Sequence, residues 1–271
     1  MSAPAVDAIA HFVAKWHRRE PEMALAEVFC PPAQRPRFRA WGALVHELRE
    51  AAFELSDARV TAVKSQWWAE ELVNLSRGRG RHPVSAELGV AQLPWPALAR
   101  ALLEQAQFDA PRPADAAQAL AQLQPLATAL AEVECGVFEA PASSPEAIAL
   151  HLLLQRLPAG LVAGDQARLP LNLLARHGLT VDQVAAGQGG ALLQDWAREL
   201  AARLPADPVP GSLFRRLRTG FDRARPLQGG ARSAGARCDR RGSPRSAARA
   251  GRSAARRSTA SGCRPWPPRA S

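Results

Sequence analysis

Two stretches of sequence say most about the fold, and the first lies at residues 44–83. It reads Leu44-Val45-His46-Glu47-Leu48-Arg49-Glu50, then Ser56-Asp57, Lys64, Trp67-Trp68-Ala69-Glu70-Glu71-Leu72 and His82-Pro83. The second reads His151-Leu152-Leu153-Leu154-Gln155-Arg156-Leu157-Pro158, then Arg168-Leu169-Pro170 and Leu173-Leu174-Ala175-Arg176-His177-Gly178. Both stretches are rich in helix-forming residues, so both are predicted to be helical.

The helical pattern extends from residue 7 to about residue 225. Apolar residues recur at three- and four-residue spacings, and prolines divide the chain into pieces of helix length. The predicted helices are 7–19, 36–54, 57–77, 95–108, 114–138, 145–163, 167–177, 187–204 and 211–224. The predicted N-caps are Ser56 or Asp57, Asp115, and Ser144 before Pro145. No stretch alternates as a strand does, so the sequence predicts an all-α bundle.

The composition changes abruptly after Arg225. Residues 1–225 contain 24 Lys and Arg and 24 Asp and Glu, whereas residues 226–271 contain 11 Arg and one acid, Asp239. From residue 228 onward there is no Leu, Ile, Val, Phe or Met. Such a segment buries too little apolar surface to offset its chain entropy, so 226–271 is predicted to be a disordered basic tail behind a helical domain, 1–225.

Three accounts of this tail stay open. A GC-rich gene translated out of frame yields this mixture of Arg, Ala, Gly, Pro and Ser, and the frame error is the favoured account. The segment is otherwise an inert extension. In the third account it binds nucleic acid or another anionic surface through its arginines.

Other features of the sequence bear on compartment and on metals. The chain has no apolar run of about eighteen residues, so no membrane-spanning helix is predicted. The N-terminus lacks a secretory pattern, which favours a cytoplasmic protein, with a peripheral position on a membrane as the alternative. The four cysteines and six histidines show no metal-ligand spacing.

The order Lys-x-x-Trp-Trp-x-x-Glu-Leu followed by His-Pro resembles the squalene/phytoene synthase family, whose members condense prenyl diphosphates head to head. The run at 151–178 is similar to a second segment of that family, which closes with His-Gly. The resemblance implies an isoprenoid-synthase-like bundle. In it the helices 36–54 and 145–163 face each other across a central cavity.

The acidic motifs of that family have no counterpart here. Matching the chain to the family pattern places the first pair of aspartates on Arg49 and Phe53, and the second pair on Leu157 and Leu161. The family's aspartates hold magnesium ions, which neutralise the diphosphate and help it to leave. Without these ions, an allylic diphosphate that ionises in an apolar cavity has no charge compensation.

Displaced carboxylates are the alternative metal site. Glu47, Glu50 and Glu54 are spaced so that they share one helix face, and Asp165 is the nearest acid of the opposing segment. These four residues would be the catalytic set of a divergent enzyme that uses magnesium. The ordinary interpretation is an acidic stripe on a solvated helix face, and it is favoured, with no cofactor.

The candidate substrate ligands are Arg35, Lys64 and Arg156. Arginine forks suit diphosphate oxygens, although arginines near the start of a helix are also common surface charge. Trp67 and Trp68 are predicted to anchor their helix in the core. Lys64 and Glu71 are predicted to pair at the surface.

Three functions follow from these observations. The favoured one is a squalene/phytoene synthase-like protein that does not catalyse, and that binds an isoprenoid or other lipid in its cavity or serves as a scaffold for a protein partner. The alternative is a divergent prenyl-diphosphate transferase of the phytoene or squalene synthase type. The third, least favoured, is a nucleic-acid-associated protein that acts through the basic tail.

Overall fold

The computed structural model describes residues 3–89, 92–107, 109, 111–160 and 167–228. Within these ranges the chain forms helices, turns and loops, with no strand, so the predicted all-α fold is confirmed. No helix in this part of the chain is long and apolar enough to cross a membrane. The predicted tail at 226–271 lies outside the described residues beyond Gln228, so its disorder stays a prediction.

Thirteen α-helices are present among the described residues. They are α1 (Ala3–Arg19), α2 (Pro21–Ala26), α3 (Arg35–Arg49), α4 (Ala58–Ser76), α5 (Pro83–Leu88), α6 (Trp95–Ala106), α7 (Ala116–Ala121), α8 (Gln124–Phe138), α9 (Pro145–Gly160), α10 (Leu171–His177), α11 (Val181–Gln183), α12 (Gly190–Ala201) and α13 (Leu213–Gln228). Short 3-10 turns (Glu27–Phe29 and Pro32–Gln34) join α2 to α3, and π-turns (Glu50–Glu54 and Val184–Gln188) follow α3 and α11.

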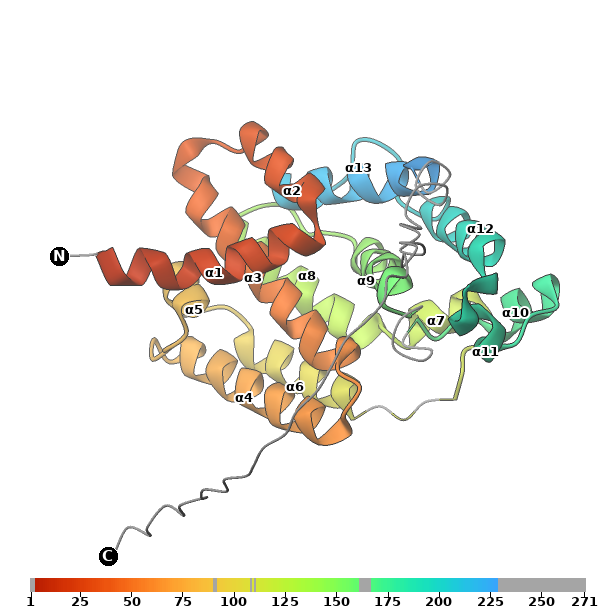
Figure 1. Ribbon diagram of the computed structural model, residues 1–271. Helices are drawn as coiled ribbons and strands as arrows, with labels where there is room; N and C mark the ends of the chain where they lie inside the picture. Colours follow the sequence, from red (N-terminus) through yellow and green to blue (C-terminus); the bar gives the residue numbers. More distant parts are fainter. Residues whose placement is uncertain (1–2, 90–91, 108, 110, 161–166, 229–271) are drawn as a thin grey trace, which may run out of the picture. The chain divides into compact units, whose positions relative to one another are not determined.

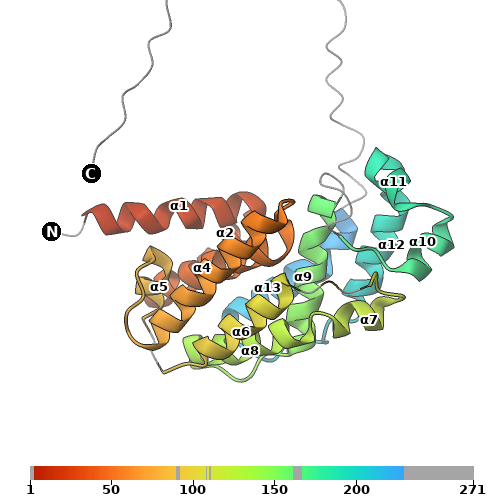
Figure 2. The same ribbon diagram turned by 90° about the horizontal axis from the view of Figure 1, so that it is seen from below.

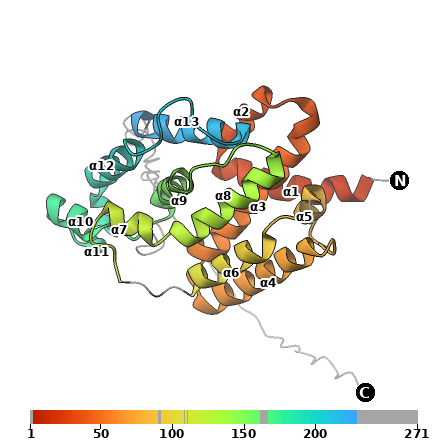
Figure 3. The ribbon, with the colours of Figure 1, turned by 180° about the vertical axis from the view of Figure 1, so that it is seen from behind.

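The helix α3 lies among elements from several parts of the chain. It contacts α1, α5 and α8, and it continues into the π-turn Glu50–Glu54, which contacts α4, α6 and α9 (Figure 1). The helices α4 and α6 pack along each other, and α6 lies beside α8 (Figure 2). Seen from behind, α8 crosses the bundle between α6 and α13, with α9 beside it (Figure 3).

Five tryptophans form the largest apolar groups of the core. Each is at most 2% exposed: Trp16, Trp41, Trp68, Trp95 and Trp196. The ring of Trp16 packs directly on the backbone of α3, because a Cβ on Gly42 would lie 2.3 Å from one of its carbons. A side chain at position 42 would therefore force the two helices apart, and glycine permits this close approach of α1 and α3.

A buried carboxylate links the middle of the chain to its last described helix. Glu134 on α8 accepts hydrogen bonds from Trp41 Nε1 (3.1 Å), Ser143 Oγ (2.8 Å) and Ser212 Oγ (3.0 Å), and pairs with Arg215 Nη2 on α13 (2.6 Å). Burial alone would raise the pKa of Glu134, but the guanidinium of Arg215 and these donors hold it below its usual value. This network ties α13 to the core.

Most of the predicted helix boundaries agree with the structure. The side chain of Asp57 caps α4, that of Asp115 caps α7, and Ser144 Oγ accepts from the backbone N–H of Ala147 at the start of α9. The predicted helix 114–138 is wrong in one respect, because it divides into α7 and α8. The break falls just before Pro125, which begins the second helix and cannot continue the hydrogen bonds of the first.

The predicted pair of helices lies close together. The segments 36–54 and 145–160 meet where the guanidinium of Arg156 lies over the ring of Phe53, 4.8 Å from its centroid, and the predicted cavity between them stays a prediction. The cavity described below opens elsewhere. It is lined by residues of α1, α3, α4 and the loop before α5, and by none of α9.

Candidate ligand-binding site

Arg49, the last residue of α3, is buried and fully engaged by its neighbours. Its Nη1 lies 2.6 Å from Glu20 Oε1, its Nε donates to Glu54 Oε1 at 2.9 Å, and its Nη2 lies 2.9 Å from His46 Nδ1. Burial would raise the pKa of Glu20, but Arg49 and Arg218 outweigh it and hold that pKa far below its usual value. A fixed cation therefore stands where the resemblance places a metal-binding aspartate.

A second buried arginine extends this network to the C-terminal helix. Arg218 on α13 pairs with Glu20 (3.0 Å), Glu22 (2.9 Å) and Asp222 (3.0 Å), and Asp222 also contacts His151 Nδ1 at 2.9 Å. We refer to Glu20, Arg49, Glu54, Arg218 and Asp222 as the buried ionic network. Burial opposes the charge of Arg218, but its three carboxylate partners raise its pKa above the usual value.

The other positions that the resemblance matches to the family's aspartates carry apolar side chains. Phe53 in the π-turn lies under Arg156, which is itself buried. Burial, with a smaller contribution from Arg168, lowers the pKa of Arg156 to about 10, so the group is still charged at neutral pH. Leu157 belongs to the apolar core, and Leu161 lies outside the described residues.

Of the three proposed catalytic acids that the structure describes, Glu47 and Glu50 lie together. Glu47 contacts Lys15 (2.7 Å) and Lys64 (3.1 Å), and Glu50 bonds the same two lysines. We refer to Lys15, Glu47, Glu50 and Lys64 as the lysine–glutamate cluster. Burial would raise the pKa of Glu50, but hydrogen bonds from both lysines lower it overall. The two charges of each sign cancel, so the cluster is formally neutral.

The third glutamate, Glu54, belongs to the buried ionic network and not to the lysine–glutamate cluster. Regular helical spacing predicted one shared face, but residues 50–54 form a π-turn, whose wider spacing rotates Glu54 toward Arg49. Asp165 lies outside the described residues. In the part of the chain that the structure describes, no group of three or more His, Cys, Asp or Glu residues is arranged to hold a metal ion.

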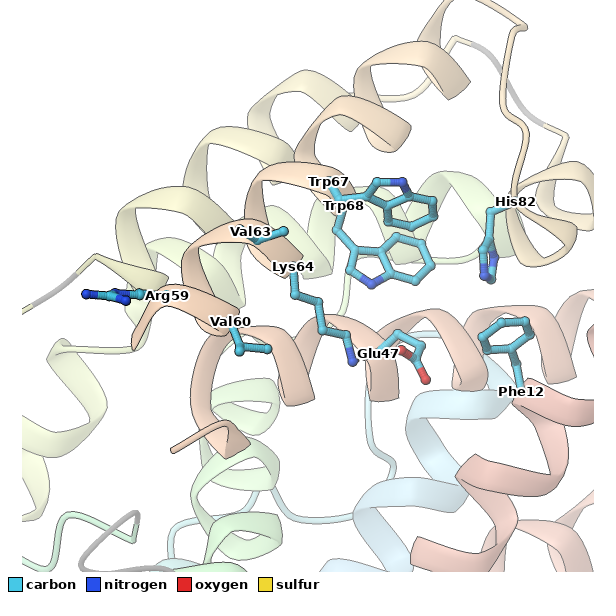
Figure 4. A pocket seen from close by; sticks show the side chains of 9 residues that line it. All are labelled: Phe12, Glu47, Arg59, Val60, Val63, Lys64, Trp67, Trp68 and His82. Carbon is cyan, nitrogen blue, oxygen red and sulfur yellow. Dashed lines mark ion pairs between the residues drawn. The ribbon is translucent and has the colours of Figure 1, made fainter. Parts of the chain in front are cut away.

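The cavity beside the cluster has a volume of about 540 Å³ (Figure 4). Its lining residues are Phe12, Glu47, Arg59, Val60, Val63, Lys64, Trp67, Trp68 and His82. Figure 4 shows Lys64 reaching from α4 toward Glu47 on α3, with the aromatic side chains grouped beside them. Within the lining, Lys64 and Glu47 form an ion pair, Arg59 adds a positive charge, and the rest is mostly apolar.

Four rings form the aromatic wall of this cavity. The ring of His82 lies 4.3 Å from that of Phe12, 4.8 Å from Trp68 and 5.6 Å from Trp67, between centroids. The Nδ1 of His82 accepts from the backbone N–H of Val84 at 3.3 Å, so this side chain caps the start of α5. Burial lowers the pKa of His82, so the imidazole is neutral at pH 7.

The residues of the Trp-Trp-x-x-Glu pattern, 67–71, build or support this aromatic wall. Trp68 is buried in the core as predicted, whereas Trp67 is 46% exposed, so its predicted core role is wrong. The predicted surface pairing of Lys64 with Glu71 is also wrong. Glu71 is buried and accepts from the backbone N–H groups of Arg81 (2.7 Å) and His82 (2.8 Å), which fixes the loop that carries His82.

The predicted substrate ligands do not form one group. Arg35 Nε donates to the carbonyl of Cys30 at 3.0 Å, Lys64 belongs to the lysine–glutamate cluster, and Arg156 stacks on Phe53. Sequence reasoning missed Glu20, Arg218 and the other α13 charges of the buried ionic network. The sequence signal that could have found Arg218 and Asp222 is the amphipathic pattern of α13, in which charged residues recur between apolar ones.

No protein-family model matches the sequence, and no curated protein was found to match it. Among solved structures, the chain is similar to the crystal structure of squalene synthase HpnC from Alicyclobacillus acidocaldarius, with 16% sequence identity and a TM-score of 0.47. The match covers 82% of this chain and 95% of that chain. The described part of the chain is therefore an all-helical protein with a mostly apolar cavity of ligand size.

Proposed function

We propose that the protein is a squalene/phytoene synthase-like binding protein that holds an isoprenoid or other lipid in the cavity between α1, α3 and α4 and does not ionise diphosphates. The observation that carries the proposal is the buried guanidinium of Arg49, held by Glu20 and Glu54. It puts a permanent positive charge where catalysis in that family needs a carboxylate that holds a metal ion.

The lysine–glutamate cluster supports the same conclusion. Magnesium prefers oxygen ligands and keeps several waters, so Glu47 and Glu50 could hold it only after Lys15 and Lys64 moved away. Both lysines contact both carboxylates, and the pKa of Lys15 is raised because these contacts outweigh its burial. Displacing them would break all four of these ion-pair contacts and leave two ammonium groups near a divalent cation.

The cavity suits an uncharged apolar ligand. Its volume falls within the usual range for small-molecule sites, roughly 300–1,000 Å³. Val60, Val63 and Trp67 each expose about half of their surface or more, and this area would be covered by a bound chain. The neutral cluster beside them can accept or donate a hydrogen bond to a polar end without adding net charge.

Purified protein incubated with farnesyl or geranylgeranyl diphosphate and magnesium is expected to release no diphosphate above the background of heat-denatured protein. The physical reason is that no group of carboxylates among the described residues is arranged to hold the magnesium ions that would compensate the leaving diphosphate. The measurement is a coupled assay for released diphosphate, with analysis of the organic phase for prenyl products. Turnover that disappears in Glu50→Gln would show that Glu50 acts catalytically and would reject the proposal.

Trp67→Ala is expected to weaken the binding of farnesol by about ten- to a hundredfold, since the bound chain loses contact with one indole ring. Equilibrium dialysis with labelled farnesol measures the dissociation constant without relying on tryptophan fluorescence. Leu171→Ala is the matched control, because Leu171 is also about half exposed but does not line the cavity. Equal affinities for Trp67→Ala and the unaltered protein would place the ligand elsewhere.

A further inference from the structure

The segment between α1 and α3 carries the most exposed group of large apolar side chains that lie close together in the described sequence. Leu25 is 71% exposed, Val28 is 70% exposed and Phe29 is 68% exposed, and we refer to these three residues as the apolar tip. They lie on α2 and the 3-10 turn that follows it, at the edge of the bundle formed by α1, α2 and α3 (Figure 1).

The apolar tip is held outward by a well-packed inner face. Met23, Ala26 and Cys30 alternate with the tip residues and are buried in the core. The carbonyl of Cys30 accepts from Arg35, and Glu27 pairs with Arg39 at 2.6 Å. The segment is therefore apolar on both faces and cannot cover the tip by a small rotation without exposing its inner face.

The segment around the apolar tip carries a net positive charge. Residues 17–39 contain five arginines and three glutamates, and every one of these glutamates is engaged by a cationic partner. Glu20 and Glu27 are buried, whereas Arg18 and Arg39 are exposed. The surface that surrounds the tip thus presents guanidinium groups and few free carboxylates.

A groove of about 810 Å³ lies along α1. Its lining includes the apolar Ile9, Val13 and Pro36 together with His17 and Arg39. His17 and Arg39 also contact Glu27, the residue before Val28, so the groove and the apolar tip have a common neighbour.

We propose that the apolar tip inserts into the surface of a lipid bilayer that carries anionic headgroups, with Arg18 and Arg39 at the level of the phosphates. Leu25 and Phe29 enter the boundary between headgroups and acyl chains, and the arginines gain from the negative surface potential. A stable protein interface buries about 800 Å² on each partner, more than three side chains provide, whereas a bilayer accepts a small projecting group of any shape. This inference goes beyond the proposed lipid binding and does not depend on it.

The test compares binding of the full chain to sedimented vesicles of phosphatidylcholine alone and of phosphatidylcholine mixed with phosphatidylglycerol. The combined variant Leu25→Ser, Val28→Ser and Phe29→Ser is expected to bind the mixed vesicles at least about tenfold more weakly than the unaltered protein. Leu171→Ser, an exposed apolar residue on α10, is the matched control and is expected to bind normally. Every protein in the comparison keeps residues 226–271, so attraction of the tail to the vesicles is the same in each.

A second measurement reports insertion directly. Phe29→Trp adds an indole at the tip, and brominated phosphatidylcholine in the mixed vesicles is expected to quench the added fluorescence, whereas Leu171→Trp gains no quenching. Equal vesicle binding by the triple variant and the unaltered protein, with no quenching at position 29, would overturn the proposal. A second outcome would also overturn the proposal: the unaltered protein self-associates and does not bind vesicles, whereas the triple variant is monomeric. The apolar tip would then be a contact between copies of the chain.

Discussion

Arg49→Met is expected to lower the free energy of unfolding by about 3 kcal/mol, the lower part of the range for breaking a buried ion pair. Methionine fills much of the volume of the arginine but removes the bond from Arg49 Nε to Glu54 at 2.9 Å, whereas the contact of Glu54 with Arg19 at 3.7 Å remains. Glu20 retains Arg218, which is why the effect is not larger. Urea unfolding at neutral pH, followed by circular dichroism, measures the change.

The matched control is Arg198→Met on α12. Arg198 also pairs with a carboxylate, Asp195, but its side chain is exposed, so the expected change is within about 0.5 kcal/mol. Arg49→Lys should lie between the two, because an ammonium keeps the charge but cannot bond Glu20, Glu54 and His46 in one plane. Equal stability of Arg49→Met and the unaltered protein would show that the buried ionic network is not required for the fold.

The parts of the fold that sequence predicts well are those that depend on neighbouring residues. Asp57, Asp115 and Ser144 cap helices because a short polar side chain before an apolar run satisfies free backbone N–H groups. His82 before Pro83 starts α5 for the same reason. These interactions span only a few residues, so the local pattern is sufficient to predict them.

The candidate site was harder to predict because its contacts join distant segments. Arg218 and Glu20 are 198 positions apart, and Arg215 and Glu134 are 81 positions apart. Composition indicates that the charges of residues 1–225 balance, but not which pairs are buried. The displaced Glu54 is different, since a single π-turn at residues 50–54 broke the regular spacing that placed it beside Glu47 and Glu50.

Position 49 is occupied by an arginine that its surroundings stabilise. The guanidinium of Arg49 lies between two carboxylates, Glu20 and Glu54, so the neighbours of this position favour a cation there. An aspartate at this position would place a third carboxylate beside Glu20 and Glu54 and would remove the cation that they share, which is costly. A metal site at this position would therefore need several coordinated changes.

The stability of the protein is expected to fall as the pH drops from about 6.5 toward 4, before the carboxylates titrate. Burial, reinforced by the guanidinium of Arg49, lowers the pKa of His46 from 6.5 to about 4. Between these values the unfolded chain binds the proton and the folded protein does not, so the free energy of unfolding decreases as the pH falls. The titration of His46 alone is expected to lower the free energy of unfolding by about 3 kcal/mol between pH 6.5 and pH 4.

His46→Gln is expected to make the loss of stability between pH 6.5 and 4.5 shallower, because its amide oxygen can still accept from Arg49 but does not titrate. Burial also lowers the pKa of His151, so part of the slope should remain. Urea unfolding at a series of pH values gives the slope, and His11→Gln, at an exposed position of α1, is the control. The carboxylates Glu20 and Glu134 have lowered pKa values, so their stabilisation is lost only below about pH 4.5. Identical slopes for His46→Gln and the unaltered protein would mean that His46 is not held neutral by burial beside Arg49.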